Sequence, residues 1–304
     1  MMPNRKQCFI IPIHSSKCTW IGAFLDSVIA HDPDRLLANV KFFLGASNGV
    51  EARLFQKWLT PYFSKISIEI LSIDDYLNFG LNMPSIAGRL RENHDGCTVN
   101  LKKFCMMFYA LKNGYNEIFV SDDDMRLLKS PNKLFDDLVS NYNSGLYLGS
   151  PPDCEQNQRI VEDCVNFFDD TEKNTLFPEG YIYSWFFDAP FYTGIELDLF
   201  FNDMSNRFDG LEGFLAKVRY ESFEHLIFQY WRVLRGTARI IDTSSIGIHR
   251  KTESLFYDDF NKIHLAYGYQ PVWVYLWEIF HQPDMLFMLP KVALAIHADR
   301  MFIP

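Results

Sequence analysis

The sequence predicts an α/β fold in which helices flank a central β-sheet. Short apolar runs typical of buried strands alternate along the chain with segments whose apolar residues recur at helical spacing. The 304 residues are 48% hydrophobic and 16% aromatic, which is enough to fill a sizeable core. No internal repeat or low-complexity tract interrupts the pattern, so a single globular domain is the simplest organisation.

The first expected elements are a strand and a helix joined by a short loop. The run CFIIPIHS, residues 8–15, is apolar until Pro12 and is followed by a helical segment from Trp20 to Ala30. Nucleotides bind beyond the carboxyl ends of such strands in open α/β folds, which makes Pro12 and His14 candidate nucleotide contacts. The alternative is a strand without a binding role, because many α/β proteins begin in this way.

Two further strands are expected over residues 40–44 and 66–73. The second of them ends at Asp74 and Asp75. A carboxylate in this position can contact a ligand at the edge of the sheet or cap the helix that follows. Both interpretations of Asp74 stay open at this point.

A helix that begins with lysines comes next. Residues 101–113, LKKFCMMFYALKN, carry apolar side chains at helical spacing and run into Asn113-Gly114, a helix-stop signal. Four basic residues lie in or before this segment and are candidate nucleotide contacts: Arg89, Arg91, Lys102 and Lys103. The alternative is a solvated helix face.

The most informative motif is the run of three carboxylates Asp122, Asp123 and Asp124 directly after the apolar residues 118–120. A buried strand that ends in this way delivers acidic side chains to the edge of a sheet where ligands bind. Neighbouring carboxylates repel and raise one another's pKa values, so such a cluster is most stable around a hard divalent cation. The alternative is a solvated Asp-rich turn.

The segment from Lys102 to Pro131 resembles the nucleotide-sugar-dependent glycosyltransferases of the GT-A fold. These enzymes share a helix, a short strand, an Asp-x-Asp motif, a few apolar residues and a proline, and Asp122 and Asp124 match that motif. The resemblance implies a Rossmann-like GT-A domain with a mixed sheet over residues 1–270. It also implies that Asp122 and Asp124 bind Mn²⁺ or Mg²⁺, which grips the diphosphate of a nucleotide sugar, most plausibly a UDP-sugar. Asp123 can also face that site.

Two further positions gain a role from the resemblance. Asp74 corresponds to a carboxylate that contacts the nucleoside. Gly194 closes DAPFYTG, residues 188–194, which is similar to the glycine turn on the acceptor side. A glycine there would permit a positive φ and a close approach of the backbone to a sugar. The alternative is a plain turn opened by Pro190.

An acidic helix start is expected at RYESFEHLIFQYW, residues 219–231, with Glu221 and Glu224 in its first turn. The resemblance gives one of these carboxylates the role of deprotonating the acceptor hydroxyl in inverting enzymes, or of orienting the acceptor in retaining ones. The sequence has Glu221-Ser222 where the family often has Glu-Asp, so either glutamate can be the relevant one. The alternative is that the helix dipole alone favours acidic residues here.

The last motif is SSIGIHRK, residues 244–251. A histidine at this distance from the end completes the metal shell in many GT-A enzymes, so the resemblance implies that His249 is a metal ligand. Arg250 and Lys251 beside it suit a diphosphate electrostatically. The alternative for His249 is a structural role.

The expected function is therefore that of a hexosyltransferase that modifies a glycan hydroxyl, in bacterial surface polysaccharide or glycolipid synthesis. One alternative is a metal-dependent nucleotidyltransferase, which is disfavoured because residues 10–17 lack the glycine-rich loop of those enzymes. The other is a non-catalytic carbohydrate- or nucleotide-binding protein of the same fold.

Composition narrows the partners and the compartment. The net charge of −9 argues against a nucleic-acid partner. The six cysteines form no Cys-x-x-Cys pair and the amino terminus has no apolar secretory segment, so we expect reduced thiols in a cytoplasmic protein. The aromatic segment 271–304 is too interrupted to span a membrane. We expect it to pack on its own domain or on a second subunit of a homodimer; the alternative is a peripheral contact with the cytoplasmic membrane face.

Overall fold

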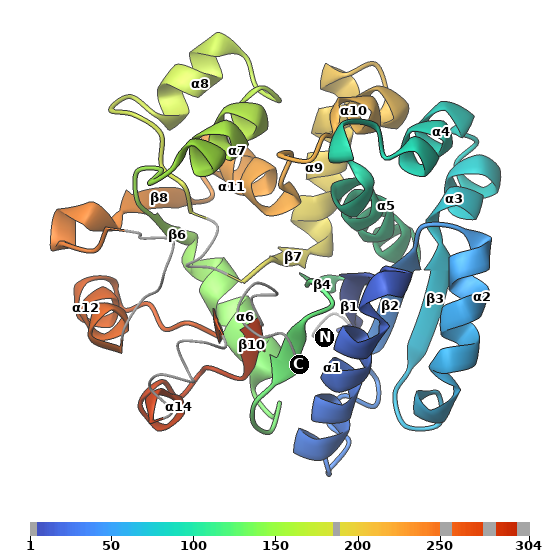
Figure 1. Ribbon diagram of the computed structural model, residues 1–304. Coiled ribbons are helices and arrows are strands. Elements are labelled where there is room, and N and C mark those ends of the chain that lie inside the picture. Colours follow the sequence, from blue (N-terminus) through green and yellow to red (C-terminus); the bar gives the residue numbers. More distant parts are fainter. Residues whose placement is uncertain (1–4, 185–188, 250–256, 276–283, 297–304) are drawn as a thin grey trace. The chain divides into compact units, whose positions relative to one another are not determined.

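The computed structural model describes residues 5–184, 189–249, 257–275 and 284–296, which form two compact units (Figure 1). The first unit comprises Met1–Pro131 and Pro190–Tyr220, and the second comprises Asn132–Ala189 and Glu221–Pro304. Each unit is described by itself below.

The first unit is built on a five-stranded sheet. Its strands, in spatial order, are β3 (Ile68–Ser72), β2 (Lys41–Ala46), β1 (Gln7–Pro12), β4 (Glu117–Val120) and β7 (Phe191–Thr193). The first four run parallel, and β7 is antiparallel to β4. The expected α/β fold with a mixed central sheet flanked by helices is therefore confirmed. The sequences of β1 and β2 are almost continuously apolar because helices cover both faces of these strands.

Helices and one short strand complete the first unit (Figure 1). They are η1 (Ser15–Lys17), α1 (Cys18–His31), α2 (Gly49–Trp58), η2 (Thr60–Tyr62), α3 (Ile73–Asp75), η3 (Tyr76–Gly80), α4 (Pro84–Glu92), η4 (His94–Gly96), α5 (Thr98–Lys112), β5 (Met125–Leu127), α9 (Gly194–Arg207) and α10 (Leu211–Lys217).

Aromatic side chains pack the sheet against the helices on its two faces. The ring of Phe9 stacks on Phe42 at a centroid distance of 4.7 Å and meets Phe119 edge-on at 5.4 Å. Phe24 of α1 packs 6.1 Å from Phe9, so α1 covers this face. Phe43 points to the other face, where Tyr109 of α5 meets it at 5.5 Å. Successive side chains of β2 thus point to opposite faces of the sheet, and the core consists of one apolar layer on each face.

Strand β1 lies at the point where the strand order reverses. The chain proceeds from β1 to β2 and β3 in one direction and then returns to β4 on the other side of β1. In open α/β sheets, ligands bind in the crevice outside the carboxyl ends of the strands at such a switch point. The loops after β1 and β4 therefore flank the expected binding position.

The second unit contains two pairs of parallel strands among its helices. Strand β6 (Leu146–Gly149) pairs with β8 (Arg239–Asp242), and β9 (Trp273–Tyr275) pairs with β10 (Leu294–Ile296). Its helices are α6 (Leu134–Ser144), α7 (Glu155–Val165), α8 (Asp170–Leu176), α11 (Glu224–Leu234), η6 (Thr243–Ile246), α12 (Tyr257–Tyr267) and α14 (Met285–Met288). Gly145 links α6 to β6 with φ +61°, and a Cβ there would lie 2.7 Å from the carbonyl oxygen of Thr237.

The carboxyl-terminal segment contributes β9, α14 and β10 to the second unit, together with residues that precede position 270. Residues 276–283 and 297–304 lie outside the described part of the chain. The division into a domain of residues 1–270 and a tail stays a prediction, as does its packing or membrane contact. In the described residues no helix combines the length and the apolar character needed to cross a bilayer. All six cysteines are described, and each is a free thiol.

Replacing Phe9 by alanine should lower the free energy of unfolding by about 3–5 kcal/mol, because the ring is 1% exposed and touches both neighbouring strands. Denaturant unfolding of the purified variant measures this loss. Phe79→Ala is the matched control, since that ring is 84% exposed and its removal should change little. Equal losses in the two variants would contradict the assignment of Phe9 to the core.

Candidate functional site

The parallel strands of the first unit bring their following residues to one edge of the sheet. Ser47 comes directly after β2. His14, Asp74 and Asp122 come after β1, β3 and β4, each separated from its strand by one residue. Ser121 is held beside β1 because its backbone N–H donates to the carbonyl oxygen of Ile10 at 2.9 Å. The sequence correctly placed the carboxylates and the loop after β1 at a common edge.

The three aspartates differ in their surroundings. The side chain of Asp122 is 41% exposed, and its Oδ1 lies 3.0 Å from Nζ of the buried Lys103. Asp123 and Asp124 are only 6% and 8% exposed. Oδ1 of Asp124 is fully buried and has no hydrogen-bond partner among the described residues. The solvated Asp-rich turn that was the alternative therefore does not describe Asp123 or Asp124.

Burial dominates the electrostatics of the two buried carboxyls. It raises the pKa of Asp124 to about 8, and the charges of Asp122 and Asp123 add to the rise. Burial likewise raises the pKa of Asp123 to about 7, although the positive charge of Lys17 opposes the shift. A buried carboxylate oxygen without a partner is costly, and a divalent cation is the ligand that would compensate this cost best.

Basic side chains surround the cluster. Lys103 pairs with Asp122, and Lys17 and Lys102 act electrostatically on Asp123. The guanidinium of Arg126 donates to the carbonyl oxygen of Met125 at 2.6 Å, and burial lowers its pKa despite the nearby Asp124. Cations of the same unit thus offset only part of the negative charge of the cluster.

Two of the expected basic nucleotide contacts bind other groups of the first unit. Arg89 donates to the carbonyl oxygens of Leu215 and Val218, both at 3.0 Å, and so ties α4 to the end of α10. Arg91 forms an ion pair with Asp74 at 2.6 Å. Asp74 also accepts a hydrogen bond from the side-chain amide of Asn78.

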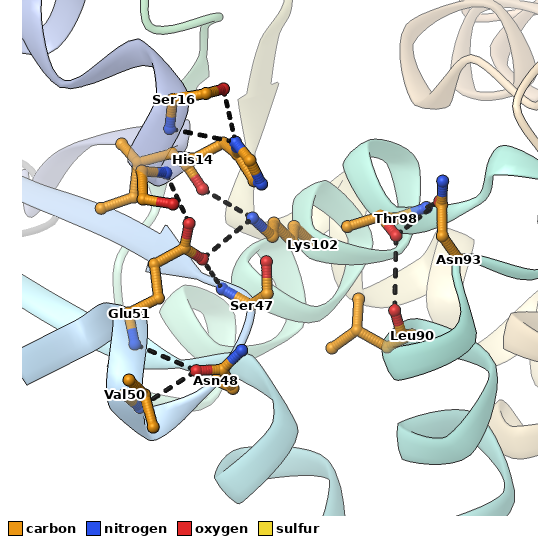
Figure 2. Close-up of polar contacts among 12 residues, drawn as sticks. His14, Ser16, Ser47, Asn48, Val50, Glu51, Leu90, Asn93, Thr98 and Lys102 are labelled. Atoms are coloured by element: carbon orange, nitrogen blue, oxygen red, sulfur yellow. Dashed lines mark hydrogen bonds and ion pairs between the residues drawn. The ribbon is translucent and has the colours of Figure 1, made fainter.

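A cleft of about 370 Å³ opens at the ends of β1 and β2. Its lining residues are His14, Ser15, Ser47, Asn48, Val50, Glu51 and Leu54. His14 caps η1 by accepting the backbone N–H of Ser16 on Nδ1 at 3.2 Å, and Figure 2 shows this contact. Pro12 is buried as the last residue of β1, two positions before this cap.

Sequence reasoning missed Glu51, which is 7% exposed and lines this cleft. The side chain of Asn48 caps α2, and an acid three residues later looks like an ordinary helix start. The sequence pattern that could have revealed Glu51 is that its helix begins shortly after a buried strand, at the edge of the sheet where ligands are expected.

The structure does not give Gly194 its expected surroundings. Its φ is not positive, and its close neighbour is the protein backbone, since a Cβ would lie 3.0 Å from Cα of Asn116. Because β7 is antiparallel, Thr193 pairs with Glu117 at the start of β4, the edge opposite the aspartates. Pro190, which precedes β7, lies at the carboxyl end of β4 instead. Its carbonyl oxygen accepts a hydrogen bond from the N–H of Val120.

The remaining predicted residues belong to the second unit. Helix α11 begins at Glu224, which is completely buried, so Glu221 precedes the helix instead of lying in its first turn. His249 is exposed after η6. Arg250 and Lys251 lie outside the described residues. The described residues contain no group of three His, Cys, Asp or Glu side chains placed to hold a metal ion, so the part of His249 in a metal shell stays a prediction.

No protein-family model and no curated protein sequence matches the chain. Several solved glycosyltransferases have a similar structure. Mouse xyloside xylosyltransferase 1 is 10% identical, with 99% of this chain and 100% of that chain covered and a TM-score of 0.48. The galactosyltransferase LgtC, solved with donor and acceptor sugar analogs, is 11% identical, with 81% and 80% covered and a TM-score of 0.39.

The glycosyltransferase GlyE of Streptococcus pneumoniae TIGR4 is 9% identical, with 98% of this chain and 55% of that chain covered and a TM-score of 0.39. These are distant likenesses of fold. We therefore base the function proposed below on the chain's own residues.

Asp124 should make stability fall as the pH rises. Its pKa is near 4 in an unfolded chain and about 8 in the folded one, so the folded state binds more protons between these values. The contribution of Asp124 to the free energy of unfolding therefore decreases from about pH 4 to pH 8. In Asp124→Asn this decrease should be smaller by at least about 1 kcal/mol.

Urea unfolding at several pH values in a chelator tests this expectation. Asp34→Asn, at an exposed position of the first unit, is the control and should keep the wild-type pH dependence. Identical pH dependence in Asp124→Asn and the wild type would show that Asp124 is not protonated in the folded protein.

Proposed function

We propose that the protein is a metal-dependent glycosyltransferase that transfers a hexosyl group from a nucleotide diphosphate donor, a UDP-sugar, to a hydroxyl of a glycan or glycolipid. The observation that carries the proposal is the buried Oδ1 of Asp124, which has no hydrogen-bond partner among the described residues and follows a strand next to the switch point of the sheet. The likeness to glycosyltransferases is in keeping with it.

The residues after β4 fit a hard divalent cation. They offer carboxylate oxygens, which Mg²⁺ and Mn²⁺ prefer, and Asp124 keeps an oxygen that no described group satisfies. Asp122 and Asp124 would hold the cation, and His249 is proposed as a further ligand. When bound, such a cation neutralises the charge that develops on the leaving diphosphate.

The chain's own cations would share that task. Nζ of Lys103 already neutralises a carboxylate of the cluster at 3.0 Å, and Lys17 lies close enough to the buried pair to lower the pKa of Asp123 and Asp124. A diphosphate placed beside the cluster would therefore meet positive charge from the loop after β1 and from α5. Fixed charges of this kind need no reorganisation during the reaction.

Glu224 and Glu221 are the proposed bases if the anomeric configuration inverts, because a carboxylate near the acceptor oxygen can take its proton. If the configuration is retained, the proton can pass to the leaving phosphate and no protein base is needed. Measuring the anomeric configuration of the product separates the two mechanisms.

The loop after β1 disfavours the nucleotidyltransferase alternative. In a phosphate-binding loop the backbone N–H groups are open to the ligand. Here the N–H of Ser15 donates to Glu51 at 2.6 Å, and that of Ser16 donates to His14. Measuring both UDP binding and sugar transfer tests the non-catalytic alternative, since such a protein would bind UDP without transferring sugar.

Asp124→Asn should reduce sugar transfer at least roughly 100-fold while leaving the fold intact, because it removes a charged cation ligand worth several kcal/mol in the transition state. Activity with a UDP-sugar panel at saturating Mn²⁺ measures this loss. Asp95→Asn is the control, since this exposed side chain lies outside the cluster. Near-normal turnover of Asp124→Asn would refute the metal assignment.

Chelation by EDTA should suppress both transfer and UDP binding, and added Mn²⁺ or Mg²⁺ should restore them. Isothermal titration of UDP with and without Mn²⁺ follows the binding step alone. Full activity in chelator would instead point to a mechanism in which the protein's cations replace the metal.

A further inference from the structure

Glu51 links three separate segments of the first unit, as Figure 2 shows, and is one of the residues that line the cleft. Its Oε1 accepts the backbone N–H of Ser15, after β1, at 2.6 Å. Its Oε2 accepts the backbone N–H of Ser47, after β2, also at 2.6 Å. Nζ of Lys102, from α5, lies 3.8 Å from Oε2. One carboxylate thus joins both strand ends to a helix on the other face of the sheet.

Lys102 completes this arrangement. Its Nζ donates to the carbonyl oxygen of Ile13 at 2.6 Å, so the lysine holds the loop after β1 as well as Glu51. Both side chains are buried, at 3% and 7% exposed. Removing one partner of a buried pair leaves an uncompensated charge, so the two groups depend on each other.

The neighbouring lysine connects the same helix to the aspartates. Lys103 Nζ contacts Asp122 at 3.0 Å, whereas Lys102 contacts the loop after β1. Consecutive residues of α5 therefore contact Glu51, which lines the cleft, and Asp122 of the carboxylate cluster.

We propose that Glu51 is a positioning residue that, with Lys102, fixes the loops after β1 and β2 in the shape that receives the nucleotide donor. This inference rests on the proposed function. Glu51 does not contact the reacting atoms in this proposal; it acts through the backbone of Ser15 and Ser47 and through Lys102.

Glutamine at position 51 has nearly the same shape but cannot reproduce these contacts. Its amide NH₂ would face a backbone N–H donor, and Lys102 would lose its countercharge. Because Glu51 itself does not touch the reacting bond in this proposal, we expect Glu51→Gln to raise the donor KM and the Kd of UDP roughly tenfold. The kcat should stay within about threefold of the wild-type value, because a loss of binding that affects the ground state and the transition state equally raises KM and leaves kcat unchanged.

The experiment measures kcat, KM and UDP affinity in Mn²⁺ for the wild type, Glu51→Gln, Lys102→Gln and the double variant. The double variant should lose affinity by less than the product of the two single losses, because each single change already breaks the same pair. Glu92→Gln, which removes an exposed negative charge of the same unit, is the matched control and should leave KM unchanged. Amide hydrogen exchange at Ser15 and Ser47 should accelerate in Glu51→Gln and not in the control.

An unchanged KM in a folded Glu51→Gln, or fully multiplicative losses in the double variant, would overturn the inference. If Glu51→Gln does not fold, Lys102→Gln decides, since an unchanged KM there has the same consequence. Failure of the wild type to bind UDP in Mn²⁺ would instead refute the proposed function, and the positioning role with it. The two failures are therefore distinguishable.

Discussion

The burial of negative charge at the end of β4 is the constraint on which the site depends. Parallel pairing with β1 places the end of β4 beside the switch point of the sheet, and the Asp123 and Asp124 side chains that follow it lose most of their contact with water. Ionised carboxyls in such a place are stable only beside positive charge, and their pKa values rise to about 7 and 8 when that charge is insufficient. A cluster of this kind is unfavourable for folding alone, which is why we interpret it as a binding site.

The surrounding charges follow from the same constraint. Helix α5 provides Lys102 and Lys103 in sequence, and burial lowers the pKa of Lys102 to about 8 even though Glu51 and Asp123 oppose that shift. Glu51 in turn accepts two backbone N–H groups, and these bonds together with Lys102 hold its pKa below the usual range against the effect of burial. Glu51 and Lys102 thus hold the loops after β1 and β2, and Lys103 pairs with Asp122.

Sequence reasoning found the residues that follow strands and missed those that depend on tertiary contacts. The strand before Asp122 and the helix before it were both visible as apolar patterns, and the carboxyl edge followed from them. Glu51 was missed because its role comes from Ser15 and Lys102, which are distant in the sequence. Gly194 was misplaced because the direction of the three-residue strand β7 has no signature in the sequence. Arg89 looked like a nucleotide contact, but its guanidinium binds carbonyl oxygens at the end of α10.

The central claim is that the carboxylates after β4 bind a divalent cation that in turn holds a nucleotide diphosphate. Anomalous diffraction from crystals grown with Mn²⁺ and UDP tests it most directly. The account predicts a manganese peak about 2.1 Å from carboxylate oxygens of Asp122 and Asp124, with the diphosphate of UDP on the same ion. Ordered UDP with no manganese at these aspartates would contradict it.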